Sequence, residues 1–182
     1  AVGEILEVLS ATKTAVRNTY GQSDTVTYIV SIVNSGTTPI TGISVTDNLG
    51  EYTFGTTTLV PLTYIDGTVK YYVNGVLQPS AVVTAGPPLV VSGITVPAGG
   101  SVTVAYEAAV NEFAPLDTTS VINNTAIVAG TGITPITAEE EITVESTPVL
   151  TITKSVSPVP VTENGTLTYT FLIQNSGFNP PK

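Results

Sequence analysis

The sequence contains no cysteine and no histidine, and it also lacks tryptophan and methionine. Without cysteine the chain has no disulfide framework and no thiolate chemistry. The absence of both cysteine and histidine removes the usual protein ligands of zinc and of other transition metals. We therefore expect neither a metal site nor a cofactor.

Charged residues are also scarce, at 10% of the 182 residues, and only 5 of them are basic against 14 acidic ones. The net charge of −9 leaves no basic stripe that could neutralise phosphates, which argues against nucleic acid as a partner. The same charge disfavours binding to anionic lipid. No run of 18 apolar residues occurs, so we expect no membrane insertion of this stretch.

The motifs of common catalytic sites are missing as well. The sequence has no Gly-x-Ser-x-Gly elbow, no Walker A loop and no Rossmann fingerprint. Asp47, Asp66 and Asp117 do not have the spacing of a calcium-binding loop. We therefore predict that the protein is not an enzyme acting on an external substrate.

What the sequence does contain is a series of short β-branched segments separated by Gly and Pro turns. Apolar residues alternate over Thr25–Val33, and Asn74-Gly75 joins two apolar runs as in a type I′ hairpin. Further strands are predicted at Leu9–Val16, Ile40–Asp47, Tyr52–Val60, Leu89–Val96, Ser101–Val110, Val121–Ala129 and Ile136–Val144. The acidic run Glu139–Glu141 suggests a solvated strand edge. This pattern predicts an all-β fold, an antiparallel β-sandwich.

The segment Leu9–Pro39 recurs without a gap as Leu150–Pro180. Identical residues at one fixed offset include Leu9/Leu150, Lys13/Lys154, Tyr28/Tyr169, Ile32/Ile173, Asn34/Asn175, Gly36/Gly177 and Pro39/Pro180. Such a long repeat unit indicates tandem domains. We predict one complete domain at residues 1–147, followed at 148–182 by the first two strands of an incomplete second copy.

The first copy carries an ordered set of short motifs. They are Lys13, Thr27-Tyr28, Asn34-Ser35-Gly36, Val45-Thr46-Asp47, Val73-Asn74-Gly75, Pro97-Ala98-Gly99 and Asn124-Thr125-Ala126. With these motifs the chain resembles the bacterial surface repeat called the DUF11 domain. The resemblance implies an Ig-like sandwich in a large secreted or cell-surface bacterial protein, without enzymatic activity.

Three polar residues suggest a reaction of the domain with itself. Some Ig-like surface domains of Gram-positive bacteria join a Lys amine to an Asn side chain with the help of a nearby carboxyl group. Here the reactants of such an intramolecular isopeptide bond are Lys13, Asn124 (or Asn123) and Asp47. Burial makes the chemistry feasible, because it favours a neutral amine and a protonated acid. The alternative is that Lys13 extends to solvent, Asn124 caps a turn and Asp47 ends its strand with an Asx-type bond.

The incomplete copy is either a fragment of a longer array of repeats, which we favour, or a donor that completes a sandwich in a neighbouring subunit. In both cases we expect it to pair with another chain, because two isolated strands are only marginally stable in water. Its candidate pairing residues are Leu150, Ile152, Leu167, Tyr169, Phe171 and Ile173. The sequence thus favours a structural stalk, spacer or fibre subunit whose partners are neighbouring repeats or copies of itself. The alternative is an adhesin that binds a ligand through loops such as Pro61–Gly67 or Asn111–Thr119.

Overall fold

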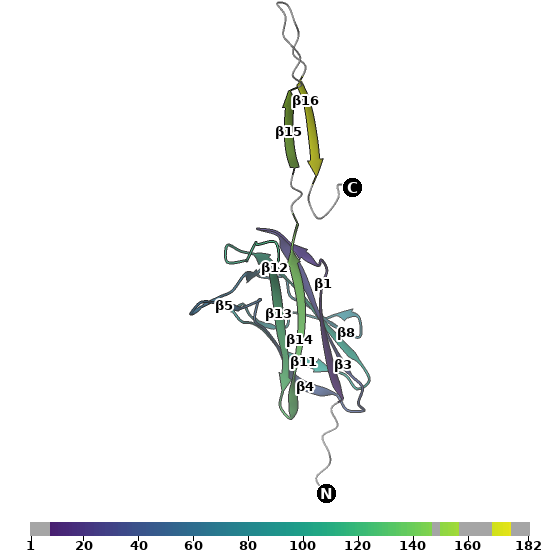
Figure 1. Cartoon of the computed structure of the whole chain (residues 1–182). Helices are drawn as coiled ribbons and strands as arrows, with labels where there is room; N and C mark the ends of the chain where they lie inside the picture. The colour runs from purple at the N-terminus through teal and green to yellow at the C-terminus, as the bar shows by residue number, and fades with distance from the viewer. Residues whose placement is uncertain (1–7, 147–149, 157–168, 176–182) are drawn as a thin grey trace, which may run out of the picture. The chain divides into compact units, whose positions relative to one another are not determined.

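The computed structural model describes residues 8–146, 150–156 and 169–175 (Figure 1). The chain divides into two units, Ala1–Val144 and Glu145–Lys182. Every regular element among the described residues is a β-strand, from β1 to β16, so the predicted all-β fold is confirmed. Two large sheets of the first unit form the predicted β-sandwich.

The first sheet contains six strands in the order β1-β3-β12-β8-β9, with β7 paired to the end of β12. Its strands are β1 (Leu9–Ala15), β3 (Thr25–Asn34), β7 (Leu62–Tyr64), β8 (Lys70–Val73), β9 (Val76–Leu77) and β12 (Ser101–Val110). Asn74 and Gly75 between β8 and β9 have φ angles of 49° and 79°. Positive φ at both positions is what a type I′ turn requires, so the predicted hairpin is confirmed.

The second sheet also contains six strands, in the order β10-β11-β4-β13-β14-β2. Its strands are β2 (Thr19–Tyr20), β4 (Ile40–Asp47), β10 (Val82–Thr84), β11 (Leu89–Val96), β13 (Val121–Gly130) and β14 (Ile133–Val144). Only β14 and β2 pair in parallel. Because β2 reaches β14 only at Thr143 and Val144, most of β14 is paired on one side, by β13.

Three predicted segments differ in the structure. Tyr52–Val60 is not one strand but a hairpin of β5 (Tyr52–Phe54) and β6 (Thr57–Leu59), because Gly55 takes a positive φ of 64° and turns the chain. The segment Pro61–Gly67 is not a continuous loop, since β7 lies within it. The last strand begins three residues earlier than predicted, at Ile133.

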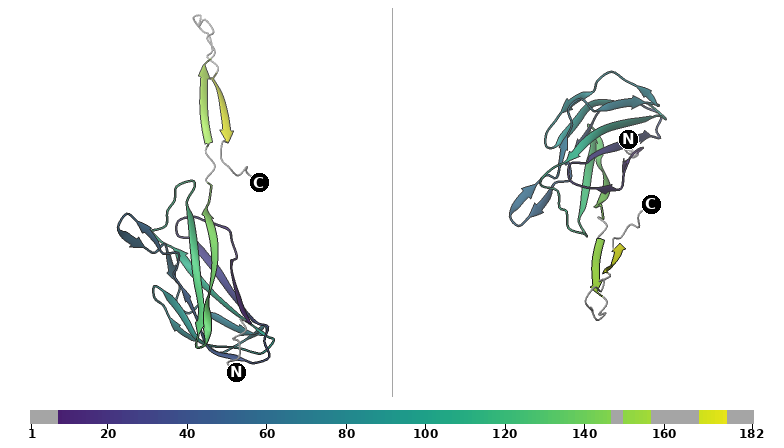
Figure 2. Two further views of the ribbon diagram at one scale, coloured as in Figure 1. Left: turned by 60° about the horizontal axis from the view of Figure 1, so that its bottom comes forward. Right: turned by 90° about the horizontal axis from the view of Figure 1, so that it is seen from above.

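The core lies between the two sheets (Figure 2). Alternation along β3 turns Val26, Tyr28, Val30 and Ile32 inward, and each is fully buried. The facing sheet contributes Ile43, Val45, Val91, Ala126 and Val128, which are buried as well. Four polar or charged residues are also buried: Lys13, Asn34, Asp47 and Asn124. All of them except Asn34 belong to the predicted isopeptide site.

The second unit contains one strand pair, β15 (Leu150–Val156) and β16 (Tyr169–Asn175). Its antiparallel register joins Leu150 to Asn175 and Lys154 to Phe171. In the first unit β1 and β3 join Leu9 to Asn34 and Lys13 to Val30. The repeated sequence therefore specifies the same pairing twice.

Candidate functional site

Lys13 is the first member of the site and is buried in the sandwich interior. It lies near the middle of β1, directly opposite Val30 of β3, and its position in the alternation turns it inward. Its Nζ lies 2.7 Å from Oδ2 of Asp47, and the two side chains are only 0% and 1% exposed. The hypothesis that Lys13 extends to solvent is therefore wrong.

Asp47 is the last residue of β4 and uses both of its carboxylate oxygens. Oδ1 accepts a hydrogen bond of 2.7 Å from the backbone N–H of Leu49, which is the predicted Asx-type bond. Oδ2 accepts from Lys13 and also from the hydroxyl of Tyr106 in β12. The turn fixes the carboxylate at the strand end, and the second oxygen faces the opposite sheet.

Asn124 is the third predicted member, and neither its amide oxygen nor its amide nitrogen has a hydrogen-bond partner, although both are buried. The other buried asparagine, Asn34, has hydrogen-bond partners for both its amide oxygen and its amide nitrogen. Asn34 donates from Nδ2 to the carbonyls of Thr38 and Val96 and accepts from the N–H of Gly36. An unsatisfied buried amide costs about 1–3 kcal/mol. Asn124 therefore does not cap a turn, and its burial requires another explanation.

Strand register brings Asn124 and Asp47 to the same face of the second sheet. Asp47 pairs with Ala126 of β13, and Asn124 lies two residues along that strand. Such diagonal neighbours have Cα atoms about 7–8 Å apart, so the two side chains project from neighbouring positions of one face. Asn123 is exposed, because it points to the outer face of β13. Of the two predicted acceptors, only Asn124 lies in the interior with Lys13.

Two tyrosines of the first sheet complete the surroundings of the lysine. The Nζ of Lys13 lies 4.8 Å from the ring centroid of Tyr28. Tyr28 also stacks against Tyr106, with 6.2 Å between ring centroids and 28° between ring planes. The buried hydroxyl of Tyr28 makes no well-formed hydrogen bond. Sequence reasoning missed both tyrosines as site residues, although the alternation of β3 and β12 places them inward.

Burial changes the proton affinities of this cluster. It lowers the pKa of Lys13 to about 8, and the adjacent Asp47 only partly opposes the decrease. Burial raises the pKa of Tyr28 and of Tyr106, so both phenols stay protonated at neutral pH. At pH 7 roughly a tenth of the Lys13 amine is therefore neutral. A neutral amine beside a carboxylate and an unsatisfied amide can act as a nucleophile toward that amide.

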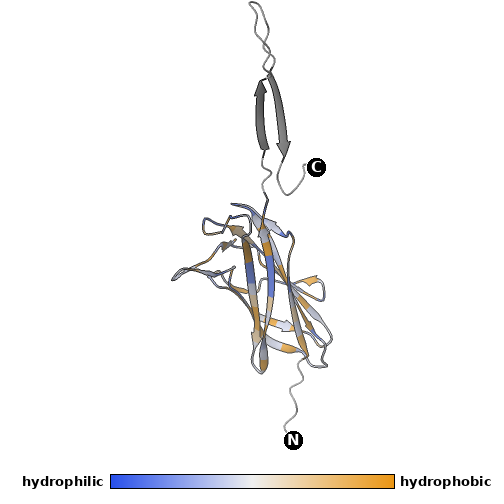
Figure 3. Ribbon diagram, viewed as in Figure 1, coloured by the Kyte–Doolittle hydropathy of each residue, from blue (hydrophilic) through white to orange (hydrophobic). Residues whose placement is uncertain are grey.

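Glu140 is a further neighbour that the sequence analysis placed on a solvated edge. It pairs directly with Asn124, and it lies between Ala138 and Ile142, which face the core. Figure 3 shows hydrophilic residues, in blue, side by side on the adjacent strands β13 and β14. Glu140 is half-buried, whereas Glu139 and Glu141 are exposed. The period-two alternation of β14 could have predicted that Glu140 faces inward and that Glu139 and Glu141 face outward.

The predicted strand-pairing residues of the second copy fall on β15 and β16, apart from Leu167, which lies outside the described residues. Leu150 and Ile152 belong to β15, and Tyr169, Phe171 and Ile173 belong to β16. In this chain the two strands pair with each other. Their pairing with a second chain stays a prediction.

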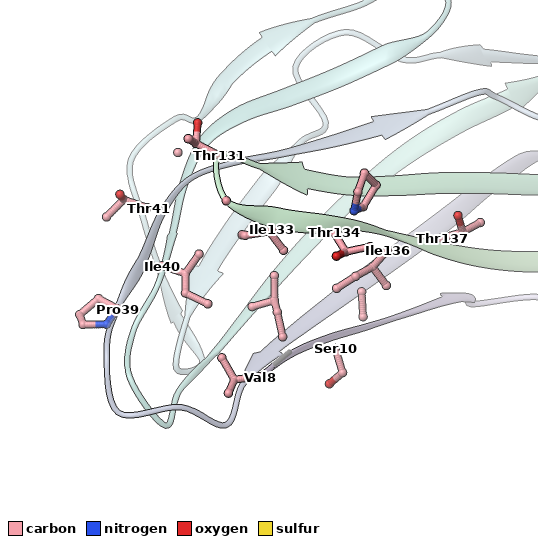
Figure 4. Close-up of a pocket in the computed structure, with 15 residues that line it drawn as sticks. Val8, Ser10, Pro39, Ile40, Thr41, Thr131, Ile133, Thr134, Ile136 and Thr137 are labelled. Carbon is pink, nitrogen blue, oxygen red and sulfur yellow. The ribbon is translucent and has the colours of Figure 1, made fainter. Parts of the chain in front are cut away.

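A large groove of the first unit is separate from the lysine site. This groove of about 830 Å³ lies at one end of the sandwich, and β1, β4 and β14 supply its walls. Figure 4 shows Val8, Ile40 and Ile133 around it. None of Lys13, Asp47 and Asn124 lines it.

Two other kinds of site are absent from the part of the chain that the structure describes. No group of three or more Asp or Glu side chains is placed there to hold a metal ion. Likewise, among these residues no helix has the length and apolarity needed to cross a membrane.

Solved bacterial surface proteins share this fold. The pilus backbone protein RrgB of Streptococcus pneumoniae matches with a TM-score of 0.52 and 13% identity, over 92% of this chain and 45% of its own. The major pilin SpaD of Corynebacterium diphtheriae matches with a TM-score of 0.54 and 16% identity, over 88% and 40%. The N-terminal domain of the Streptococcus gordonii adhesin Sgo0707 matches with a TM-score of 0.52 and 11% identity, over 74% and 32%.

These similarities concern the fold, and the chain spans less than half the length of each of these three proteins. No family model matches the chain, so its resemblance to the DUF11 repeat stays a prediction. No curated protein matches it in sequence either. What the comparisons establish is an Ig-like β-sandwich of the kind found in pilins.

Proposed function

We propose that this chain is a non-catalytic structural module of a bacterial cell-surface stalk or fibre, and that its first unit forms an isopeptide bond between Lys13 and Asn124. The observation that carries the proposal is the buried Lys13–Asp47 contact of 2.7 Å beside the unsatisfied Asn124 amide. A buried ion pair alone is weak evidence of stabilisation, and an unpaired amide is costly. Formation of a covalent bond between Lys13 and Asn124 would explain why the buried ion pair and the unsatisfied amide occur together.

The reaction needs no oxidant and no cofactor. The Lys13 ammonium transfers a proton to the Asp47 carboxylate across their contact, which leaves a neutral amine and a carboxylic acid. The Nζ lone pair then forms a bond to Cγ of Asn124. Asp47 delivers its proton to Nδ2 and takes one from Nζ, the Cγ–Nδ2 bond breaks, and ammonia leaves. The product is a secondary amide, and Asp47 returns from the carboxylic acid to the carboxylate when the departing ammonia takes up its proton as ammonium.

Such a bond suits a module that carries load. Lys13 lies in the first strand and Asn124 in the next-to-last long strand of the first unit. Force that enters through β1 would pass through the bond into β13 and β14, so the strands between them would not be pulled apart. The bond would also close a loop of roughly a hundred residues, which by analogy with a disulfide stabilises the fold by about 5 kcal/mol.

The intact mass of the purified 182-residue chain tests this proposal. We expect a mass lower than that of the sequence by one ammonia, and a branched peptide joining Lys13 to Asn124 after digestion. Lys13→Ala and Asn124→Ala should each keep the full mass of their own sequences. Lys70→Ala and Asn123→Ala are matched controls, since both residues are exposed, and each should still lose ammonia. A wild-type chain of full mass, with Lys13 open to amine labelling after denaturation, contradicts the bond.

Assembly is the second part of the proposal, and it assigns strand pairing to the second copy. The backbone edges of β15 and β16 that do not face each other offer hydrogen-bonding groups to another chain, as in donor-strand addition. Deleting residues 149–182 should then reduce assembly, measured by light scattering and electron microscopy. Unchanged assembly, or a strictly monomeric parent chain, argues against strand pairing but leaves the Lys13–Asn124 bond unaffected.

The adhesin alternative has one specific observation in its favour. In the loop Asn111–Thr119, Phe113 and Leu116 are about half exposed. This loop lies beside the β5–β6 hairpin, since the Tyr52 hydroxyl donates to the Phe113 carbonyl, and a cavity of about 440 Å³ opens between them. Binding to host matrix proteins or glycans that is lost in Phe113→Ser and retained in Val76→Ser, another exposed apolar residue, would favour this alternative.

A further inference from the structure

Tyr28 is a neutral donor whose hydroxyl lies close enough to the Asn124 amide for the amide to lower the pKa of the phenol. Its ring lies under the Lys13 amine, with 4.8 Å from Nζ to the centroid. Its hydroxyl and both polar atoms of the Asn124 amide are buried without well-formed hydrogen bonds. Two adjacent unsatisfied groups are expensive in a folded core, since each costs about 1–3 kcal/mol.

The other polar side chains near Lys13, those of Asp47 and Tyr106, already take part in hydrogen bonds. Oδ1 of Asp47 is bonded to the Leu49 N–H at 2.7 Å, and Oδ2 accepts from Lys13 and from Tyr106. Among the described residues no hydrogen bond joins Asp47 to Asn124. The Tyr106 hydroxyl is directed at Asp47, so it is not available to the amide either.

We propose that Tyr28 is a catalytic residue of the self-cross-linking reaction, whose hydroxyl donates a hydrogen bond to Oδ1 of Asn124 as negative charge develops there. The inference rests on the proposed Lys13–Asn124 bond. When Nζ attacks Cγ, the electron pair of the carbonyl double bond moves to Oδ1. The hydroxyl stabilises this oxyanion and keeps its own proton, while Asp47 carries the proton that leaves with ammonia. The work is thus divided between an acid–base group and an oxyanion donor.

The environment of Tyr28 fits this role. Burial raises the pKa of its phenol, and the nearby Asn124 amide offsets only part of the increase, so the hydroxyl remains a donor over the whole neutral range. Stacking on Tyr106 fixes the ring, with centroids 6.2 Å apart. The repeat retains this residue together with the lysine, as Tyr169 and Lys154. A donor that is held in place before the reaction costs no reorganisation during it.

The rate of bond formation in Tyr28→Phe tests the inference. The full chain is made by cell-free synthesis in a short pulse, samples are quenched in acid over time, and the fraction that has lost ammonia is measured by intact mass. We expect Tyr28→Phe to react about 100-fold more slowly than wild type, which is the effect of removing one oxyanion donor. Tyr20→Phe is the matched control, because the Tyr20 hydroxyl donates instead to the Pro115 carbonyl, and it should react at the wild-type rate.

A second measurement separates catalysis from packing. In a Lys13→Ala background no bond can form, so the denaturant midpoint reports only the fold. Because the Tyr28 hydroxyl makes no well-formed hydrogen bond, adding Tyr28→Phe should leave this midpoint unchanged or raise it slightly. A wild-type rate in Tyr28→Phe overturns the inference while the bond itself stands, and slow reaction with a lowered midpoint overturns it as well. A wild-type chain that never loses ammonia overturns the inference and the proposed bond together.

Discussion

The strand pairs β1–β3 and β15–β16 are two copies of one sequence pattern with one register, yet they have different surroundings. In the first pair Lys13 lies opposite Val30, and in the second Lys154 lies opposite Phe171. β3 continues into a six-stranded sheet through β12, whereas β15 and β16 form a sheet of two strands. The same local sequence pattern thus occurs once in a six-stranded sheet and once in a two-stranded sheet of the described residues.

This comparison shows that the register of two strands and the surroundings of the buried lysine depend on different parts of the sequence. Alternation and turn residues within about thirty positions are enough to specify the register of two strands. The carboxylate, the amide and the second tyrosine around Lys13 come from β4, β13 and β12, which are distant in sequence. We therefore expect amide formation at Lys13 to depend on residues that lie outside the β1–β3 strand pair.

The largest effect should come from Asp47→Ala, which removes the carboxylate that β4 places beside Lys13. Without the carboxylate the bond does not form, so about 5 kcal/mol of cross-link stabilisation is lost. Lys13 also stays buried without its partner, which costs about 3 kcal/mol more. Urea denaturation should show a greater loss of stability than in Asn124→Ala. Lys154→Ala is the control and should leave the first unit unchanged, and equal stability of Asp47→Ala and Asn124→Ala contradicts the expectation.

The three candidate residues were predicted from the sequence because a lysine, an asparagine and a carboxyl group are the reactants used by some Ig-like surface domains, and the sandwich was predicted because nearly every strand alternates. Asn123 and Asn124 could not be separated until the inward face of β13 was known, since the strand carries polar residues on both faces. Tyr28 and Tyr106 read as ordinary core residues, and their role depends on which strands are neighbours. Register across β13 and β14, which sequence periodicity does not give, brought Glu140 to the site.

The next effect is a pH dependence in Asn124→Ala, where Lys13 keeps its amine. The folded state lowers the pKa of Lys13 from 10.5 to about 8, so between these values the unfolded chain binds more protons. Stability should therefore rise with pH above about 8, by on the order of 2 kcal/mol near pH 10.

Above pH 10 the buried tyrosines oppose this gain in Asn124→Ala. Burial raises the pKa of Tyr20 to about 12, so the unfolded chain loses its phenol protons first and stability falls again. Denaturation of Asn124→Ala between pH 6 and 11 should thus show a maximum near pH 10. The proposed bond turns the Lys13 nitrogen of the wild type into an amide, so the rise above pH 8 should be absent there, and an equal rise in both proteins contradicts the bond.

A smaller effect is expected from Val30→Phe, which gives the first copy the residue that the second carries at Phe171. Val30 is fully buried opposite Lys13, so the larger ring has to displace packed neighbours. Overpacking of this kind typically costs about 1–3 kcal/mol. Calorimetry should show a lower Tm, whereas Val33→Phe, at an exposed position of the same strand, should change it little. An unchanged Tm in Val30→Phe would mean that the core around Val30 can accommodate a phenylalanine, the residue that the second copy carries at this position.

The smallest effect concerns Glu140, whose charge acts on Lys13 without touching it. Glu140 lies on the inner face opposite Asn124, and its negative charge raises the pKa of Lys13 slightly against the effect of burial. In the Asn124→Ala background, Glu140→Gln should therefore lower the Lys13 pKa by less than one unit. The resonances of the Lys13 side chain, followed by NMR through the titration, report this pKa directly. Glu141→Gln makes the same change of charge on the exposed face and should shift the pKa less. Equal shifts in the two variants would mean that net charge, and not the inward position of Glu140, sets its influence on the lysine.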